Sequence, residues 1–251
     1  MTKRNSSGQI LVASVLIIAL ILLSTELYIY ELGKIIGETN SNVLSDFIFA
    51  IRSGSHHIVV GSLANVSRGG ANQTLTINLQ KWVSFVERQY QFGTFLLDFT
   101  LREISPYSSG IRIFWGSDGV GVSGAYVNFT LELSDRGVNV NLPYTMNITT
   151  TLLVQGTYTG IQGNVKQVNV TCNLSNEDKP ALAKDIILYY KNLNNWLVPG
   201  PSNNYTLTDY GNGTYFMSFL ANISLDNVEI SVHVSDQREI YVKTNVTCSE
   251  I

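Results

Sequence analysis

The feature that most constrains this chain is an apolar run close to its N-terminus. Residues 10–30 carry a single charge, that of Glu26, and they follow a short basic leader at residues 1–8. As a helix the run would be about 31 Å long, close to the thickness of the hydrocarbon core of a bilayer. It is also longer than the apolar part of a cleaved secretory signal. We therefore expect a transmembrane helix at residues 9–31, with a cytoplasmic leader and an extracellular remainder.

The junction between the leader and the apolar run has a specific sequence. Gly8 ends the leader, and Gln9 begins the uninterrupted apolar segment. This arrangement resembles the class III signal of archaeal type IV pilins and pilin-like proteins. The resemblance implies cleavage by a prepilin peptidase between Gly8 and Gln9, self-association through residues 9–31, and the lipid bilayer and pilus assembly machinery as partners. Ala13 stands where bacterial pilins carry a glutamate, and a plain signal anchor explains the same residues without assembly.

The glycosylation motif Asn-x-Ser/Thr is a second sign of an extracellular protein. It occurs eleven times, whereas the Asn, Ser and Thr content would give about four by chance. The motif at Asn5 falls in the leader, and the other ten follow the apolar run. The ten predicted glycosylation sites are Asn65, Asn72, Asn128, Asn147, Asn169, Asn173, Asn204, Asn212, Asn222 and Asn245.

Hydrophobic periodicity predicts a head domain directly after the apolar run. Apolar residues at helical spacing predict helices at residues 32–63 and 74–90. Alternation of apolar and polar residues predicts antiparallel strands at residues 93–156. Together these elements define an α+β head at residues 32–163. The predicted fold class is therefore a membrane-anchored α+β protein, in which a long N-terminal transmembrane helix continues into this head.

The last part of the chain, residues 164–251, has the pattern of an all-β sandwich. Its segment DYGNGTY, residues 209–215, resembles the D-x-G-x-G-T-Y signature of immunoglobulin-like (filamin-like) domains. The resemblance implies that fold and leaves the function open. Cys172 and Cys248 fall in the inward phase of the first and last strands. In an extracellular chain they favour a disulfide, with two buried thiols as the alternative.

No constellation of catalytic or metal-binding residues emerges from the sequence. Adjacent His56 and His57 would point apart on a helix, and His233 is expected as a plain histidine on the outer face of a strand. The glycine-rich stretch at residues 116–124 lacks the lysine of a phosphate-binding loop, and we expect a flexible loop there. A net charge of −3 with 14% charged residues provides no basic stripe for nucleic acid. We therefore expect no metal, no cofactor and no enzymatic activity.

These features predict two functions. The first hypothesis is a pilin-like subunit of a cell-surface, type IV pilus-like filament, which assembles through its N-terminal helix and displays glycosylated β domains for adhesion or surface contact. The alternative is a non-assembling single-pass membrane glycoprotein, such as an adhesin or an envelope component. Processing before Gln9 distinguishes the two, because a plain anchor keeps its leader.

Overall fold

The structure is a computed structural model that describes residues 18–29, 40–90, 94–135, 138–224 and 227–251. Its helices are a helical stretch at residues 18–29, α2 (Asn40–Ser67) and α3 (Thr74–Gln89). Its strands are β1 (Thr94–Leu101), β2 (Ile111–Trp115), β3 (Val120–Asp135), β4 (Val138–Gln162), β5 (Val165–Asn176), β6 (Lys179–Pro180), β7 (Ala183–Asn192), β8 (Asn195–Leu197), β9 (Thr206–Asp209), β10 (Thr214–Asn222), β11 (Glu229–Asp236), β12 (Tyr241–Thr247) and β13 (Ser249–Glu250). A short 3-10 helix, η1 (Pro201–Asn203), connects β8 to β9.

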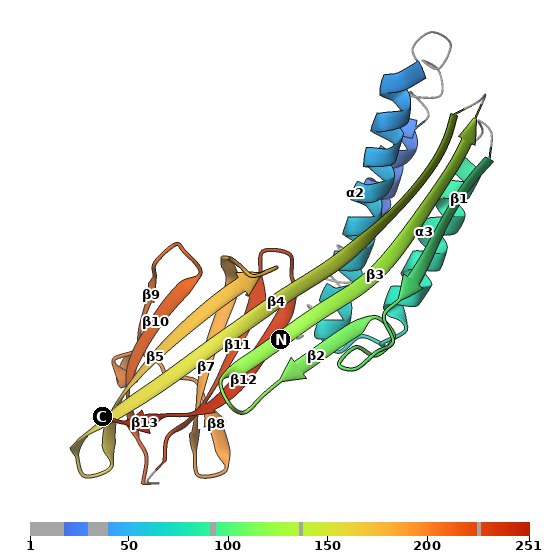
Figure 1. Ribbon diagram of the computed structural model, residues 1–251. Coiled ribbons are helices and arrows are strands. Elements are labelled where there is room, and N and C mark those ends of the chain that lie inside the picture. The colour runs from blue at the N-terminus through green and yellow to red at the C-terminus, as the bar shows by residue number, and fades with distance from the viewer. Residues whose placement is uncertain (1–17, 30–39, 91–93, 136–137, 225–226) are drawn as a thin grey trace, which may run out of the picture.

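The strands form two sheets (Figure 1). The larger sheet has the order β1-β3-β4-β5-β10-β9, with β2, β13 and β6 attached to β3, β4 and β5. The smaller sheet has the order β12-β11-β7-β8 and packs against the lower part of the larger one. The paired strands are antiparallel except for β13, which pairs with β4 in parallel. The C-terminal part is therefore a β-sandwich.

The long strands β3 and β4 serve both parts of the molecule. They pair without a break along the whole of β3, and β4 then continues into the sandwich, where it pairs with β5. The upper half of this hairpin lies against α2, whereas α3 lies against α2 and β1 (Figure 1). Ile148 of β4 belongs to the core under the helices, whereas Leu152 on the same strand belongs to the core of the sandwich. One strand thus connects the two cores.

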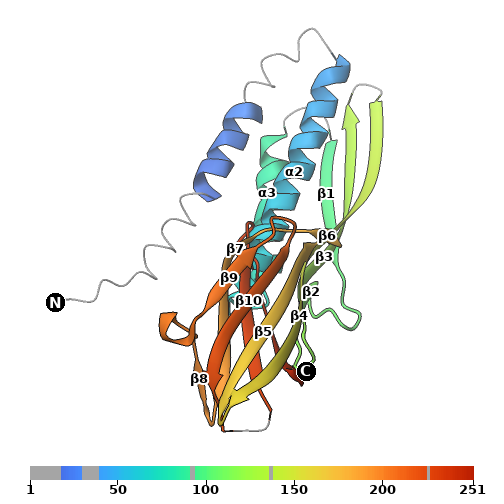
Figure 2. The same ribbon diagram turned by 90° about the vertical axis from the view of Figure 1, so that its left-hand side faces the viewer.

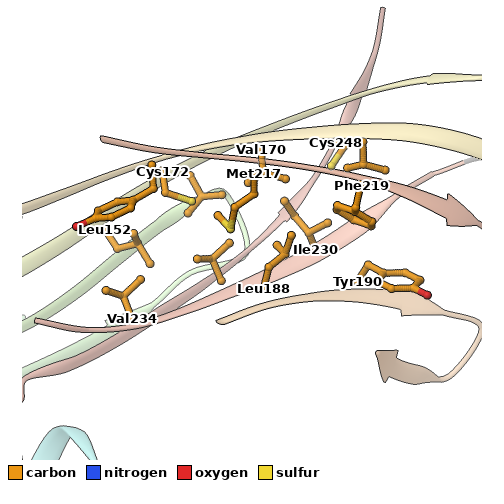
Figure 3. Packing of buried hydrophobic residues seen from close by; sticks show 14 of the residues in the cluster. Leu152, Val170, Cys172, Leu188, Tyr190, Met217, Phe219, Ile230, Val234 and Cys248 are labelled. Carbon is orange, nitrogen blue, oxygen red and sulfur yellow. The ribbon is translucent and has the colours of Figure 1, made fainter. Parts of the chain in front are cut away.

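The sandwich core is filled from both sheets (Figure 3). Met217 and Phe219 come from the larger sheet, and Leu188 and Ile230 from the smaller one. Each of the four is at most 2% exposed. Burying an apolar side chain of this size contributes about 1.5–3 kcal/mol to stability, so these contacts hold the two sheets together.

The larger sheet also continues through the boundary predicted between residues 163 and 164. That boundary lies in the turn between β4 and β5, where Gly163 has a φ of 57°. The two strands that this turn connects, β4 and β5, pair with each other along their length, so they belong to one sheet. The division into domains at residues 32–163 and 164–251 stays a prediction about independent folding units.

The predicted fold class is wrong. Strands make up most of the regular structure, and among the described residues no helix combines the length and the apolar character needed to cross a bilayer. The apolar run is helical at residues 18–29, which is about 18 Å of helix, and the longer α2 carries charged residues such as Asp46 and Arg52. Residues 9–17 and 30–31 of the predicted transmembrane helix lie outside the described residues. The predicted single-pass membrane localisation, with a cytoplasmic N-terminus and extracellular C-terminal domains, is contradicted by the same finding.

The other helices follow the predicted periodicity closely. α3 begins at the predicted residue 74 and ends one residue before the predicted end. α2 extends four residues past the helix predicted at residues 32–63, and residues 32–39 of that helix lie outside the described residues. Leu75, Leu79 and Val86 of α3 are fully buried, as their spacing predicts.

α2 and α3 approach each other closely at Gly54. A Cβ atom at this position would lie 2.3 Å from two ring atoms of Trp82, which is 3% exposed. The indole Nε1 of Trp82 donates a hydrogen bond to Ser55 Oγ at 3.0 Å. Glycine therefore makes room for a buried tryptophan, although glycine is a weak helix former.

Two glycines of α2 should respond to the same substitution with opposite signs. We expect Gly54→Ala to lower the free energy of unfolding by about 1–3 kcal/mol, because the new methyl group overpacks against Trp82. Gly61→Ala should raise it by about 1 kcal/mol, because nothing lies within 4 Å of a Cβ there and alanine favours the helix. Urea denaturation of both variants measures the difference. Equal shifts in one direction would contradict the close packing at Gly54.

Candidate functional site

The helix at residues 18–29 presents apolar side chains to solvent around most of its circumference. It lies beside α2 and α3 (Figure 2). Two of its residues reach the core under the helices, Ile29 at 8% exposure and the partly buried Leu22. The exposed large apolar residues, which we call the apolar helix surface, are Ile18, Leu20, Ile21, Leu23, Leu27 and Tyr28. Contiguous apolar surfaces are typical of sites that contact another protein or a membrane.

The polar residues of this helix do little to interrupt its apolar character. Ser24 Oγ and Thr25 Oγ1 donate hydrogen bonds to the carbonyl oxygen of Ile21 at 2.9 and 2.6 Å. Their hydrogen-bonding capacity is thus partly used within the helix. Glu26 is exposed and takes part in none of the ion pairs formed among the described residues. Its carboxylate is the one formal charge on the helix at residues 18–29.

The predicted processing site lies outside the described residues, because Gly8 and Gln9 fall within residues 1–17. Its cleavage stays a prediction.

The predicted glycosylation sites are accessible. None of the ten asparagines is buried, and all except the half-buried Asn169 are exposed. The five predicted to face outward on strands (Asn128, Asn147, Asn169, Asn173 and Asn245) each have at least one buried neighbour in the strand. Because a glycan needs an exposed side chain, the placement is compatible with glycosylation, and the use of each site stays a prediction.

The two cysteines are buried free thiols in place of the predicted disulfide. Figure 3 shows the side chains of Cys172 and Cys248 apart from one another in the sandwich core. Burial raises the pKa of the Cys248 thiol to about 12, and it raises the pKa of Cys172 as well. Buried, protonated thiols are chemically inert. They act here as apolar core residues.

His233 is more than the plain surface histidine that the sequence predicts. It lies on the outer side of β11, where its Nδ1 is 2.9 Å from the Tyr241 hydroxyl and its Nε2 is 3.0 Å from Ser231 Oγ. The ring centroid of Tyr189 lies 4.6 Å from the imidazole. Burial, and then the positive charge of Lys243, lower the pKa of His233 from 6.5 to about 4. The imidazole of His233 is therefore neutral and both of its nitrogens have hydrogen-bond partners, so we assign it a structural role in the smaller sheet.

This depressed pKa predicts a loss of stability in mild acid. Because the folded-state pKa of His233 lies below the unfolded value, its stabilising contribution is complete above pH 6.5 and is lost as the pH falls toward 4. The ring is half-buried, so we expect a loss of about 1–2 kcal/mol. Unfolding free energies measured from pH 7 to 4.5 should fall less steeply for His233→Gln than for the wild type. His56→Gln is the comparison: the pKa of His56 is lowered in the same direction, by partial desolvation and then by the charge of His57, but its side chain is exposed, so its share of the slope should be smaller. Identical slopes in wild type and His233→Gln would contradict the assignment.

A buried ionic cluster joins the turn between β11 and β12 to the larger sheet. Asp236 is fully buried, and Arg238 donates to its Oδ2 at 2.9 Å and to Glu177 Oε1 at 2.8 Å. Arg238 also donates to the carbonyl oxygen of Thr149 at 2.9 Å. One guanidinium thus bridges two carboxylates, and both of these ion pairs are made within the protein.

The remaining candidates do not converge on a reactive centre. His56 and His57 are both exposed, with ring planes 86° apart, and His57 Nδ1 is 2.7 Å from the carbonyl oxygen of Ser53. Across the part of the chain that the structure describes, no group of three or more His, Cys, Asp or Glu side chains could hold a metal ion. The absence of enzymatic activity and of nucleic-acid binding stays a prediction.

The glycine-rich stretch at residues 116–124 is a packed junction, which corrects the predicted flexible loop. The carbonyl oxygen of Gly116 accepts a hydrogen bond from Asn245 N at 3.0 Å, and Gly119 N donates to the carbonyl oxygen of Asn245 at 2.9 Å. A Cβ at Gly121 would lie 2.4 Å from the carbonyl oxygen of Lys243. The glycines therefore let β3 approach β12 closely, a contact between strands far apart in the sequence.

The fold and the helix at residues 18–29 together define a β-sandwich protein with a helical layer and an exposed apolar surface. No protein-family model matches the chain, and the comparison with curated proteins found no match.

Proposed function

We propose that the chain is a pilin-like subunit of a cell-surface filament, which assembles with copies of itself through the apolar helix surface. The observation that carries this proposal is that exposed apolar side chains gather on one short helix: Leu20 is 56% exposed, Leu23 54% and Leu27 60%. A helix that is apolar on nearly all sides needs an apolar environment. In a filament, neighbouring copies of the chain provide that environment.

The distribution of polar groups supports the same proposal. Among the described residues, neither core includes a side chain of the apolar helix surface, so the sandwich core does not depend on that surface. The accessible Asn-x-Ser/Thr sites are spread over the helical layer and the sandwich, whereas none of the ten lies on the helix at residues 18–29. Glycans at these sites would leave the helix free to associate. The glycosylated β domains would then form the outer surface of the filament, available for adhesion or surface contact.

Processing provides the experiment that tests this function. Mass spectrometry of the protein purified from its native source should find Gln9 as the N-terminus, because the resemblance at Gly8 and Gln9 implies a prepilin peptidase. Gly8→Phe should prevent cleavage and abolish filaments seen by electron microscopy. Filaments that persist with an unprocessed N-terminus would overturn the pilin-like assignment.

A further inference from the structure

A single large aromatic side chain on α2 is strongly exposed. Phe49 is 73% exposed, and it lies on the side of α2 that faces away from the buried Phe47 and Ile51. Residues three positions to either side lie on the same helix face. These are Asp46 and Arg52, both exposed. We call Asp46, Phe49 and Arg52 the α2 stripe: an acid, an aromatic ring and a base in order along the helix.

The helix at residues 18–29 carries a matching set at the same spacing. Leu20, Leu23 and Glu26 follow one another at intervals of three, and all three are exposed. Within one chain, Leu22 and Ile29 of this helix contact the core, whereas Leu23 and Glu26 are exposed. The residues of the α2 stripe are exposed as well, so the helix of the same chain does not cover them.

We propose, on the basis of the filament function above, that the helix at residues 18–29 of one copy docks on the α2 stripe of the next copy. Leu23 packs against Phe49, and the carboxylate of Glu26 pairs with the guanidinium of Arg52. The two surfaces in this contact are different, so each copy can contact one neighbour through its helix at residues 18–29 and another neighbour through its α2 stripe. Such a head-to-tail contact propagates into an open filament where the rotation between copies does not close a ring.

The charges of the α2 stripe select the direction in which the two helices dock. With Leu23 on Phe49 and the helices parallel, Glu26 lies opposite Arg52. With the helices antiparallel, Glu26 would lie opposite Asp46, where two carboxylates repel each other. Arg52 is available for this pairing, because it forms none of the ion pairs within the described part of the chain. Its guanidinium carbon lies 5.4 Å from the centroid of the Tyr144 ring, and this contact does not use its charge in an ion pair. The parallel arrangement follows.

Charge exchange tests this pairing directly. We expect Glu26→Arg and Arg52→Glu each to raise the protein concentration needed for assembly by about tenfold or more, as measured by sedimentation of the full chain. The double variant, in which the two charges are exchanged, should recover most of the loss. Glu87→Arg and Arg88→Glu are the matched controls, because they make the same changes on the exposed face of α3 and should leave assembly unchanged.

The outcomes separate this pairing from the proposed function. Assembly that is unchanged in both single variants, or not recovered in the double variant, would overturn the pairing of Glu26 with Arg52. The filament function would survive that result if replacing the leucines of the apolar helix surface still abolished assembly. A wild-type chain that stays monomeric at every concentration would overturn both.

Discussion

Asp236→Ala should lower the free energy of unfolding by about 3–5 kcal/mol, the loss typical of breaking a buried ion pair. Asp236 has no exposed surface. Its Oδ1 accepts hydrogen bonds from the backbone N–H groups of Arg238 and Ile240, both at 2.9 Å. Its Oδ2 accepts from Thr150 Oγ1 at 3.0 Å and from Arg238 Nε at 2.9 Å. Removing the carboxylate would leave these donors without their acceptor.

The effect should be large because this turn also holds the helical layer to the sandwich. Tyr241 N donates to Ser67 Oγ at 3.0 Å at the end of α2, and Glu239 forms ion pairs with Arg68 and Lys184. Chemical denaturation measures the loss, and Asp185→Ala, which removes an exposed carboxylate from β7, should change the unfolding free energy by no more than about 0.5 kcal/mol. A loss below about 1 kcal/mol for Asp236→Ala would show that the cluster is not a structural centre.

A triple variant, Leu20→Ser, Leu23→Ser and Leu27→Ser, should abolish self-association while the monomer stays folded. Each leucine that is buried on assembly contributes about 1.5 kcal/mol or more, so losing three weakens association by about a thousandfold or more. The unfolding free energy of the monomer should change little, because the three side chains are exposed there. Analytical ultracentrifugation measures association, and circular dichroism checks the fold.

The control for this variant removes three exposed leucines elsewhere. Leu153, Leu193 and Leu207 are 45%, 61% and 44% exposed, on or beside strands of the sandwich. Replacing them by serine makes the same chemical change outside the apolar helix surface. If both triple variants lost association equally, general surface hydrophobicity would explain the assembly.

Periodicity made much of the β-structure and α3 predictable from the sequence. On β3, Val127, Phe129 and Leu131 alternate with outward residues, and all three are at most 1% exposed. Asn128 between them is exposed, as a glycosylation site requires. The strands could be predicted because a half-buried strand has a local sequence pattern with a period of two.

The remaining features depend on contacts that no local pattern contains. The apolar run predicts burial without revealing what covers it, so a transmembrane helix and a surface for other protein copies look alike in sequence. Asp236 and His233 occupy ordinary strand positions, and their surroundings come from β4, β7 and β12. Glycine at residue 121 signals flexibility locally, whereas the backbone of β12 makes it a packing requirement.

The most direct test of self-association through the apolar helix surface is thiol labelling of a Leu23→Cys variant. Both native cysteines are buried, so the introduced thiol is the accessible one. A maleimide probe should label Cys at this position rapidly in the dilute monomer and become at least about tenfold slower after assembly, because burial blocks access to the thiol. Leu193→Cys, on the sandwich, should label equally fast in both states. Equal labelling of Leu23→Cys before and after assembly would contradict the account, because the apolar helix surface would then remain open to solvent in the filament.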